Sequence, residues 1–428
     1  MTDSALTIDP PGGAFSAEVC VPGDKSLSHR ALVFSAMAEG RSRVSGLGTG
    51  ADIVSTGRLL AGLGVKFGDG VVESPGVEGW RESAADLQCG NSGTTMRLMA
   101  GALAGRPFRS TLTGDASLNQ RPMQRLVAPL EALGASIELS DTGTAPLSIG
   151  SDGGLHRSDI ALPLASAQVR SAFCLAALQA EGVSRVDSPG GFRDHTERWL
   201  TTMGLGERET PTRFAVQPGP VPTWNYEVAG DPSSAAFLWA SAAICEGSEV
   251  STPGISLNPG RIGFLEILEA MGAEVAAEVT GALLGDPVGT VTVRGRGLHA
   301  TEVAGPLAIA ALDELPLVAV LGAYGEGVTV VKDAKELRAK ESDRITTTVD
   351  MIRALGGGAE ATEDGFAVVG TGWLEAGTVE SRGDHRIAMA AAIAASRATG
   401  PVTIIDAAAA SVSWPDFFPA LEAVWSSR

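Results

Sequence analysis

The segment from Ser166 to Gly182, SAQVRSAFCLAALQAEG, shows the pattern that decides the fold of this chain. It begins with a residue type that caps helix N-termini, continues through small and apolar residues, and ends at a glycine. Because the interior is apolar almost all round, the pattern predicts a buried helix. It occurs six times, and the glycine follows the polar residue after 14 or 16 positions: Asp24–Gly40, Asn91–Gly105, Ser166–Gly182, Asp231–Gly247, Asp313–Gly327 and Asp384–Gly400.

A second, amphipathic helix is predicted after each of these segments and a short β-rich run. Its end is marked in five cases by leucine or methionine followed by glycine: Leu63-Gly64, Leu133-Gly134, Met203-Gly204, Met271-Gly272 and Leu355-Gly356. A sixth such helix, from Phe418 to Trp425, is cut short by the end of the chain. The sequence therefore predicts six repeated helix-and-sheet units, each with one buried and one exposed helix.

Six units exceed one ordinary core, so we expect an α/β fold of two similar domains with three units each. The first domain would span residues 21–228. The second would combine residues 1–20 with 229–428, because the strand-like segment Phe15–Val21 is left over at the N-terminus. The hinge would lie near residues 20–22 and 228–231.

Charge and cysteine usage exclude several classes of function. A net charge of −18 and a pI near 4.7 argue against a broad basic surface for nucleic acid or membrane. The four cysteines are widely spaced, and residues 1–14 lack a basic, apolar leader, so we expect free thiols and a cytoplasmic enzyme. No histidine or cysteine pair has metal-ligand spacing, so no metal is expected.

Charged motifs stand at four of the six predicted helix starts: Asp24–Arg30, Asn91–Arg97, Ser166–Arg170 and Asp384–Arg386. A cation in the first turn opposes the helix dipole, which favours anions there. A bound phosphate or carboxylate explains the recurrence, because N–H groups and cations then converge on it. Further basic runs at residues 121–125, 193–197 and 335–344 indicate two anionic ligands. Asp313, Glu341 and Lys25 are then candidates for acid–base work.

Structural interpretations of single residues stay open beside this one. Arg97 and Arg170 lie inside apolar helices and would also serve as ion-pair partners. His195 and His385 fit hydrogen-bonded structural roles better than the role of a base. Arg125 fits a solvated or paired surface residue.

Seven motifs together resemble the 5-enolpyruvylshikimate-3-phosphate synthase family, over about residues 12 to 420. They are GDKSxSHR at 23–30, GNSGT at 90–94, RPM at 121–123, SAQ at 166–168, DELP at 313–316, KESDR at 340–344 and DHR at 384–386. The resemblance implies the enolpyruvyl transferase fold, two domains of three repeated units, which agrees with the repeats.

The resemblance also implies transfer of the enolpyruvyl group of phosphoenolpyruvate to the 5-hydroxyl of shikimate 3-phosphate, with release of phosphate and without a cofactor. By match to the family motifs, shikimate 3-phosphate would meet Lys25, Ser26, Arg30, Ser166, Ala167, Gln168, Arg193, Asp313 and Lys340. Phosphoenolpyruvate would meet Lys25, Gly93, Arg121, Gln168, Glu341, Arg344 and Arg386. Glu341 would protonate carbon 3, and Asp313 and Lys25 would handle the hydroxyl. Domain closure would keep water from the tetrahedral ketal intermediate.

Several positions resemble the second, bacterial class of this family, including the 166–168 motif and Val412. Arg170 stands where that class usually has lysine. Gly93 is typical of enzymes that are sensitive to glyphosate, whereas Leu98 replaces a proline common in them, so the inhibitor response stays open.

Two rival functions remain at this stage. The first is the sister transfer to UDP-N-acetylglucosamine, whose family has Lys-Asn where this chain has Lys25 and Ser26. The second is a non-catalytic scaffold of six repeats, which would not require Asp313 and Glu341 beside a cationic loop. We expect a monomer that acts on two small-molecule substrates.

Overall fold

The computed structural model describes residues 5–190 and 192–428, and the chain divides into two compact domains. Domain I comprises Gly23–Ala229 and Ala282–Asp286. Domain II comprises the chain up to Pro22, Gly230–Gly281 and Pro287–Arg428. Residues 1–4 of the predicted segment 1–20 lie outside the described residues. The short segment of domain I after residue 281 has no counterpart among the boundaries predicted from the sequence.

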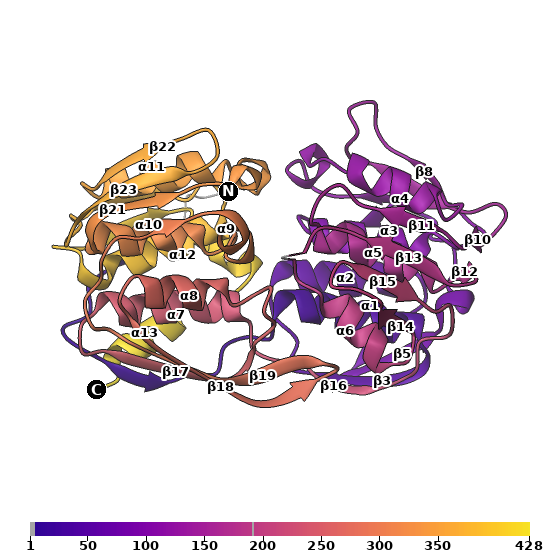
Figure 1. Ribbon diagram of the computed structural model, residues 1–428, viewed down its shortest axis with the longest axis horizontal. Coiled ribbons are helices and arrows are strands. Elements are labelled where there is room, and N and C mark those ends of the chain that lie inside the picture. Colours follow the sequence, from indigo (N-terminus) through magenta and orange to yellow (C-terminus); the bar gives the residue numbers. More distant parts are fainter. Residues whose placement is uncertain (1–4, 191) are drawn as a thin grey trace. The chain divides into compact units, whose positions relative to one another are not determined.

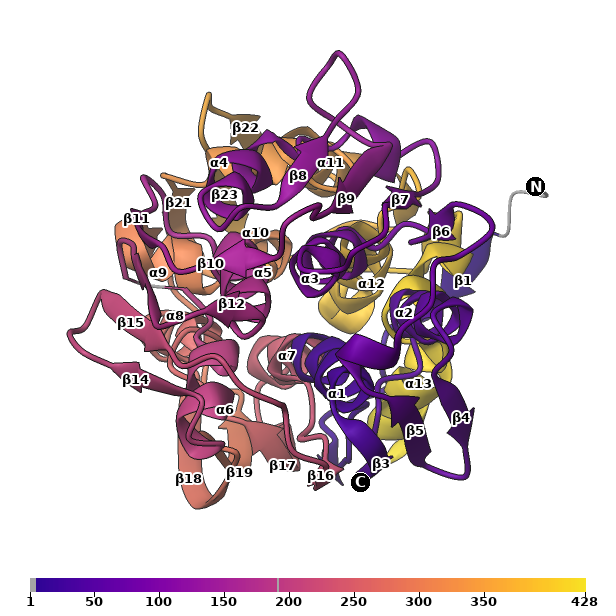
Figure 2. The same cartoon turned by 90° about the vertical axis from the view of Figure 1, so that its right-hand side faces the viewer.

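Domain I holds α1, α3 and α5 in its interior, and its sheets surround them (Figures 1 and 2). Its α-helices are α1 (Lys25–Met37), α2 (Ala51–Gly62), α3 (Gly93–Leu103), α4 (Val127–Glu131), α5 (Ala167–Ala177) and α6 (His195–Thr202). Its strands are β3 (Glu39–Ser45), β4 (Lys66–Gly68), β5 (Val71–Pro75), β6 (Leu87–Gln88), β7 (Ser110–Thr113), β8 (Ser136–Glu138), β9 (Leu147–Gly150), β10 (Leu155–His156), β11 (Asp159–Ala161), β12 (Ala180–Glu181), β13 (Ser184–Asp187), β14 (Gly206–Arg208), β15 (Arg213–Val216) and β16 (Asn225–Glu227).

Domain II is built in the same way around α7, α10 and α12, which contact one another. Its α-helices are α7 (Pro232–Ile244), α8 (Gly263–Ala270), α9 (Gly305–Ala310), α10 (Leu315–Tyr324), α11 (Arg344–Ala354), α12 (His385–Ala394) and α13 (Phe417–Ser426). Its strands are β1 (Leu6–Ile8), β2 (Ser16–Glu18), β17 (Glu249–Ser256), β18 (Glu274–Leu283), β19 (Asp286–Arg294), β20 (Glu302–Val303), β21 (Glu326–Val331), β22 (Gly358–Ala361), β23 (Phe366–Thr371), β24 (Gly377–Glu380) and β25 (Val402–Ile405).

The principal sheets of both domains repeat one topology, in which a parallel pair of strands continues into an antiparallel hairpin. The orders are β16-β3-β5-β4, β6-β7-β9-β8 and β11-β13-β15-β14 in domain I, and β2-β17-β19-β18 and β20-β21-β23-β22 in domain II. The last sheet, β24-β25-β1, replaces the hairpin with the antiparallel strand β1 from the chain start. The predicted fold of two domains with repeated helix-and-sheet units is therefore confirmed.

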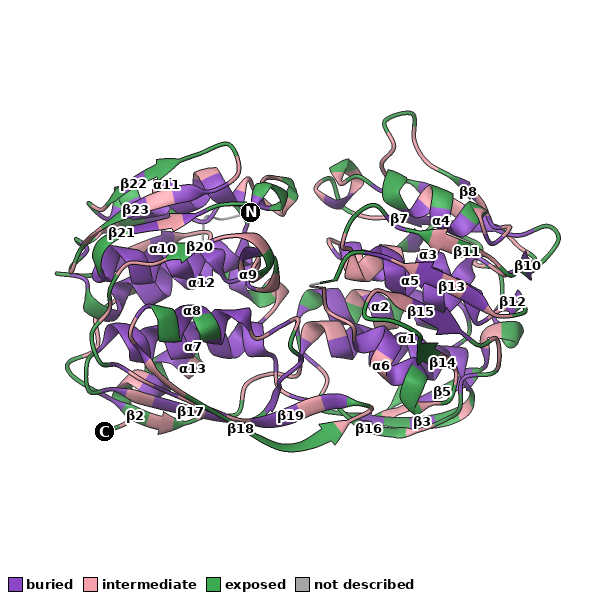
Figure 3. Ribbon diagram, viewed as in Figure 1, coloured by how far each residue is buried: buried purple, intermediate pink, exposed green. Residues whose placement is uncertain are grey.

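Burial distinguishes the two kinds of helix (Figure 3). In α7 every residue is buried, because its small and apolar side chains leave no polar face. In α8 the buried residues share one side, and Glu266 and Glu269 lie on the exposed side. Among the helices of residues 5–190 and 192–428, none has both the length and the hydropathy needed to cross a membrane.

Two predicted helix starts and the predicted ends of the buried helices were wrong. Ser92, not Asn91, caps α3, and α10 begins at Leu315 after Glu314. The buried helices end two to six residues before the marker glycines. At Gly40 and Gly327 the reason is visible: both lie in strands, with φ of 114° and 101°, where the chain needs a conformation that other residues rarely adopt.

Candidate active site

The first turn of α1 presents Lys25 and Ser26 beyond the N-cap Asp24. The Asp24 carboxylate accepts a hydrogen bond from the backbone N–H of Leu27 at 2.8 Å. Lys25 is half-buried and forms an ion pair with Asp52 in the first turn of α2. Sequence reasoning missed Asp52, because an acidic residue in a first helical turn is commonplace and signals no partner.

Arg30, one turn further along α1, is almost completely buried. Its Nε donates to Thr196 Oγ1 at 2.8 Å, and its terminal nitrogens donate to Ser171 Oγ at 2.8 Å and to the Ser26 carbonyl at 3.0 Å. Burial lowers the pKa of Arg30, and the nearby charge of Arg193 acts in the same direction. The predicted ligands Arg30 and Arg193 thus lie within electrostatic range of each other.

A buried chain of hydrogen bonds joins α1 and the middle of α2 to the start of α3. His29 Nδ1 lies 2.8 Å from Thr56 Oγ1, and Thr56 Oγ1 lies 2.7 Å from Thr95 Oγ1. Thr95 in turn donates to the N-cap Ser92 at 2.7 Å. Burial lowers the pKa of His29 well below its ordinary value, and Lys25 adds to the effect, so the ring is neutral at pH 7.

The start of α3 lies beside two arginines and a glutamine from α5. A Cβ atom on Gly93 would approach the guanidinium of Arg97 to 2.9 Å and that of Arg121 to 3.6 Å. Arg97 donates to Gln168 Oε1 at 2.6 Å, and Arg121 donates to Asn91 Oδ1 at 2.5 Å. The structure therefore brings together Gly93, Arg121 and Gln168, which were predicted from the sequence, and adds Arg97 and Asn91.

Ser166 caps α5, accepting from the N–H of Val169 at 3.5 Å. One turn on, Arg170 is fully buried and donates to Glu197 Oε1 at 2.5 Å. It also donates to Ser188 Oγ at 2.7 Å and to the Thr212 carbonyl at 2.8 Å. Of the two interpretations of Arg170, the ion-pair partner is confirmed.

A second charged cluster lies in domain II, around the buried guanidinium of Arg344. Its Nε donates to Asp384 Oδ2 at 2.8 Å, and a terminal nitrogen lies 2.6 Å from Glu341 Oε2. Asp313 Oδ1 lies 3.3 Å both from Arg344 and from Lys340 Nζ. Burial opposes the charge of Arg344, but Asp384, Glu341 and Asp313 outweigh it and raise its pKa. The cluster thus unites the predicted residues Asp313, Lys340, Glu341 and Arg344.

Arg386, in the first turn of α12, lies among groups of α7 and the residue before α10. It donates to the carbonyl of Ser233 at 3.3 Å, lies 3.6 Å from Glu314 Oε1 and packs over Phe237 at 5.8 Å. Its own N–H bonds to the cap residue Asp384 at 2.9 Å. The contact between Arg386 and Glu314 was not predicted from the sequence. The sequence predicts the start of that helix at the adjacent Asp313 instead, because aspartate is preferred at N-caps.

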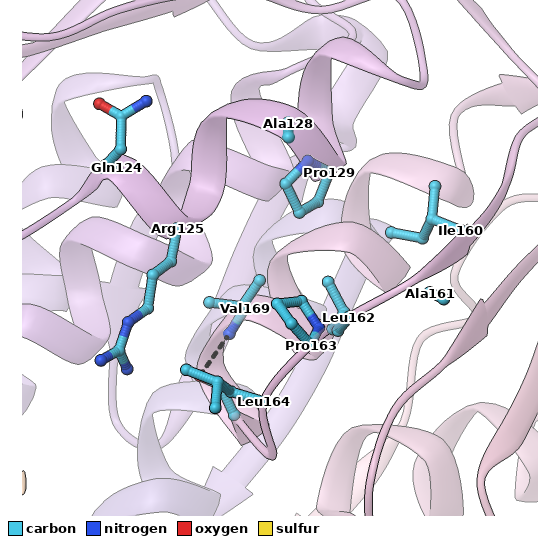
Figure 4. A pocket seen from close by; sticks show the side chains of 11 residues that line it. Gln124, Arg125, Ala128, Pro129, Ile160, Ala161, Leu162, Pro163, Leu164 and Val169 are labelled. Atoms are coloured by element: carbon cyan, nitrogen blue, oxygen red, sulfur yellow. Dashed lines mark hydrogen bonds between the residues drawn. The ribbon is translucent and has the colours of Figure 1, made fainter.

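A pocket of about 430 Å³ adjoins the start of α5 and lies outside both charged clusters. Figure 4 shows Arg125 on one side of it and Ile160 and Ala161 on the other. Most of its lining is apolar, and Ser166 is the residue that it shares with the predicted substrate ligands. Within residues 5–190 and 192–428, no group of three histidine, cysteine or acidic residues is arranged to hold a metal ion.

Comparison with known proteins identifies the family that this chain resembles. The sequence profile of EPSP synthase (3-phosphoshikimate 1-carboxyvinyltransferase) matches residues 10–421. The 3-phosphoshikimate 1-carboxyvinyltransferase of Herpetosiphon aurantiacus is 46% identical over 409 residues, which cover 94% of this chain and 95% of that one. The EPSP synthase structure from Acinetobacter baumannii has a TM-score of 0.87 at 38% identity, and covers 99% of this chain and 98% of its own. The enolpyruvyl transferase NikO from Streptomyces tendae shares the fold, with a TM-score of 0.78 at 16% identity over 99% of this chain and 98% of that one.

Proposed function

The chain belongs to the EPSP synthase family, and on this premise we propose which of its residues carry the reaction. The protein is a 3-phosphoshikimate 1-carboxyvinyltransferase. It transfers the enolpyruvyl group of phosphoenolpyruvate to the 5-hydroxyl of shikimate 3-phosphate and releases phosphate, a step of the shikimate pathway. The relatives do not favour the rival transfer to UDP-N-acetylglucosamine.

Shikimate 3-phosphate is proposed to bind mainly at the helix starts of domain I. Its ligands there would be Lys25, Ser26, Arg30, Ser166, Ala167, Gln168 and Arg193, with Asp313 and Lys340 from domain II. Helix starts offer backbone N–H groups and a favourable dipole to a phosphate. The charge of Arg193 acts on Arg30 and lowers its pKa, which supports a shared anion, because a negative charge between two cations stabilises both.

Phosphoenolpyruvate is proposed to bind arginines of both domains. Its ligands would be Lys25, Gly93, Arg121, Gln168, Glu341, Arg344 and Arg386. An arginine can bind a carboxylate or phosphate through two parallel hydrogen bonds, which a lysine cannot copy. The absent side chain of Gly93 supports this assignment, because a Cβ atom there would lie only 2.9 Å from the Arg97 guanidinium and would touch that of Arg121 at 3.6 Å.

We propose that Glu341 exchanges a proton with carbon 3 of phosphoenolpyruvate. Asp313 and Lys25 would take up the proton of the 5-hydroxyl group of shikimate 3-phosphate. The observation that carries this assignment is that Arg344 contacts the carboxylates of Glu341 and Asp313 together. A substrate anion on Arg344 would compete with Glu341 for the same N–H groups. A carboxylate released from a guanidinium takes up a proton more readily, which suits a general acid.

The proposed bond changes, an addition followed by an elimination, need no co-reactant besides the two substrates. In the addition, the 5-hydroxyl oxygen bonds to carbon 2, its proton passes to Asp313 or Lys25, and carbon 3 gains a proton from Glu341. In the elimination, carbon 3 returns a proton to Glu341, and the electrons of that C–H bond form the double bond between carbons 2 and 3 again. The bond from carbon 2 to the phosphate oxygen breaks, and the leaving phosphate takes the bonding electrons and the proton that Asp313 or Lys25 had accepted. Glu341 thereby acts first as acid and then as base, as reversal of one proton transfer requires.

The test compares Glu341→Gln with Glu336→Gln, an exposed residue of the short helix Lys335–Ala339, which ends two residues before Glu341. In deuterium oxide with both substrates, the parent enzyme and Glu336→Gln should place deuterium on carbon 3. Glu341→Gln should bind shikimate 3-phosphate normally, yet should release phosphate at least about a hundredfold more slowly and place no deuterium there. Normal deuterium incorporation in Glu341→Gln would assign the proton to another residue.

We also propose a cytoplasmic monomer. All the assigned ligands lie in one chain, and the four cysteines are unpaired thiols, as a reducing compartment requires. Light scattering after size exclusion should give the mass of one chain, 43.7 kDa; twice that mass would show a dimer.

A further inference from the structure

Helix α6 begins with a buried polar contact that the reaction scheme does not use. His195, its first residue, is completely buried, and its Nδ1 lies 2.9 Å from Asp286 Oδ2. The same carboxylate oxygen accepts from Trp199 Nε1 at 3.1 Å, one turn along the helix. Asp286 is itself completely buried. A buried carboxylate that serves two donors of one helix fixes both the position and the rotation of that helix.

The residues around His195 connect this contact to the proposed ligands of shikimate 3-phosphate. Arg193 stands two positions before His195 in the chain. Thr196, directly after it, accepts the hydrogen bond of Arg30 at 2.8 Å. Glu197 then accepts the bond of Arg170 from α5 at 2.5 Å. A shift of the first turn of α6 would therefore displace Arg193 and disturb the bond that holds Arg30.

Asp286 reaches this helix from an unexpected part of the chain. It is the first residue of β19, and strands β18 and β19 pair within the sheet of domain II. Only the turn, Ala282–Asp286, is grouped with domain I. At the same turn, the Gly285 carbonyl accepts from Arg198 of α6 at 3.0 Å.

We infer that Asp286 is a positioning residue for shikimate 3-phosphate, acting through His195 on the first turn of α6 and hence on Arg193. The inference rests on the proposed role of Arg193 as a ligand of the sugar phosphate. Asp286 touches neither substrate in this account. Its loss should therefore raise the Michaelis constant for shikimate 3-phosphate, while kcat and the constant for phosphoenolpyruvate change little.

The first test uses a pair of substitutions at each end of the hydrogen bond between His195 and Asp286. Asp286→Ala removes the acceptor and should raise the Michaelis constant for shikimate 3-phosphate about tenfold, the size expected when buried donors lose their partner. Asp286→Asn keeps an acceptor oxygen and should stay within about threefold of the parent enzyme. If Asp286→Ala does not fold, His195→Ala and His195→Asn give the same comparison, because asparagine can place an N–H group near that of the imidazole. Equal increases in both Michaelis constants, or no rescue by the asparagine variants, would overturn the inference.

A double-variant cycle separates this inference from the proposed function. Arg193→Met alone should raise the Michaelis constant for shikimate 3-phosphate. If Asp286 acts mainly through Arg193, Asp286→Ala should raise this constant much less when Arg193 is already methionine than in the parent enzyme. Full additivity would overturn the positioning role and leave Arg193 a ligand. No effect of Arg193→Met would overturn the role of Arg193 and, with it, the route proposed for Asp286.

Discussion

Arg170 and Arg344 are both buried arginines, but their partners give them different roles. Arg170 binds Glu197, Ser188 and a backbone carbonyl, all inside domain I. Arg344 binds carboxylates whose side chains remain 16–17% exposed, those of Asp313 and Glu341. A substrate can therefore reach Asp313 and Glu341 beside Arg344, but not the buried partners of Arg170.

Arg121→Lys should weaken the binding of phosphoenolpyruvate more than that of shikimate 3-phosphate. Loss of a bidentate, charge-assisted contact should raise the Michaelis constant for phosphoenolpyruvate about ten- to hundredfold and that for shikimate 3-phosphate less. Steady-state kinetics with each substrate varied in turn measures both constants. Arg125→Lys, at an exposed position four residues on, is the matched control and should change neither. A larger effect on shikimate 3-phosphate would remove Arg121 from its proposed site.

Arg170→Met should destabilise the protein in a pH-dependent manner. Burial raises the pKa of Glu197 above its ordinary 4.5, and the charge of Arg170 opposes this rise. Without Arg170 the folded-state pKa rises further, so the folded protein holds a proton that the unfolded chain loses above about pH 4.5. The parent protein shares this loss up to its own folded-state pKa of Glu197, which lies above 4.5. The additional loss in Arg170→Met should therefore grow with pH above that pKa and reach about 3–5 kcal/mol.

Urea unfolding of Arg170→Met at pH 5 and pH 8 measures this difference. The double variant Arg170→Met, Glu197→Gln should recover most of the lost stability at pH 8, since no buried charge remains. A loss that is independent of pH would contradict the account.

Sequence reasoning predicted those residues whose role is local. Asp24, Ser166, Asp231 and Asp384 all cap helices as expected. It missed Asp52 and Asp286, because their partners Lys25 and His195 are brought near by packing and not by spacing along the chain.

At the scale of elements, the ends of the exposed helices were the most predictable feature. The glycines of the Leu/Met-Gly signals have φ between 72° and 101°. At Gly64 the next residue, Val65, bonds back to the carbonyl of Leu60 at 3.2 Å, which closes the helix end. The ends of the buried helices could not be predicted in this way, because these helices end before their marker glycines, of which Gly40 and Gly327 lie in the following strands.

Two alanine substitutions near α2 should act in opposite directions. Gly64→Ala forces a side chain onto a residue with φ of 101° and should cost about 1–2 kcal/mol. Gly57→Ala lies inside α2, where an added Cβ meets no atom within 4 Å, and should gain about 0.5–1 kcal/mol. Urea midpoints of both variants against the parent protein test this, and shifts of the same sign would contradict it.

At the scale of the whole molecule, the repeats and the two-domain fold followed from the sequence. The extra segment Ala282–Asp286 did not, because nothing in the sequence of the turn between β18 and β19 indicates a partner in α6.

Binding of both substrates is expected to draw the domains together. The proposed ligands of each substrate come from both domains, so the complex that reacts must engage both at once. Small-angle scattering should show a smaller radius of gyration with shikimate 3-phosphate and a non-reacting phosphoenolpyruvate analogue than without ligands. Equal radii would contradict closure. Arg344→Met, which removes a proposed ligand, should reduce the change.

Because domain II contains segments that precede and follow domain I in the sequence, the order of synthesis affects how the two domains fold. Strand β1 pairs with β25, with Leu6 opposite Ile404, so β1 leaves the ribosome long before the strand with which it pairs. Gly23–Ala229 is made early and can begin to fold by itself, but Asp286, the acceptor for His195 and Trp199, is added 57 residues later. Domain II thus contains residues that are made before domain I and residues that are made after it, so it is completed later than domain I.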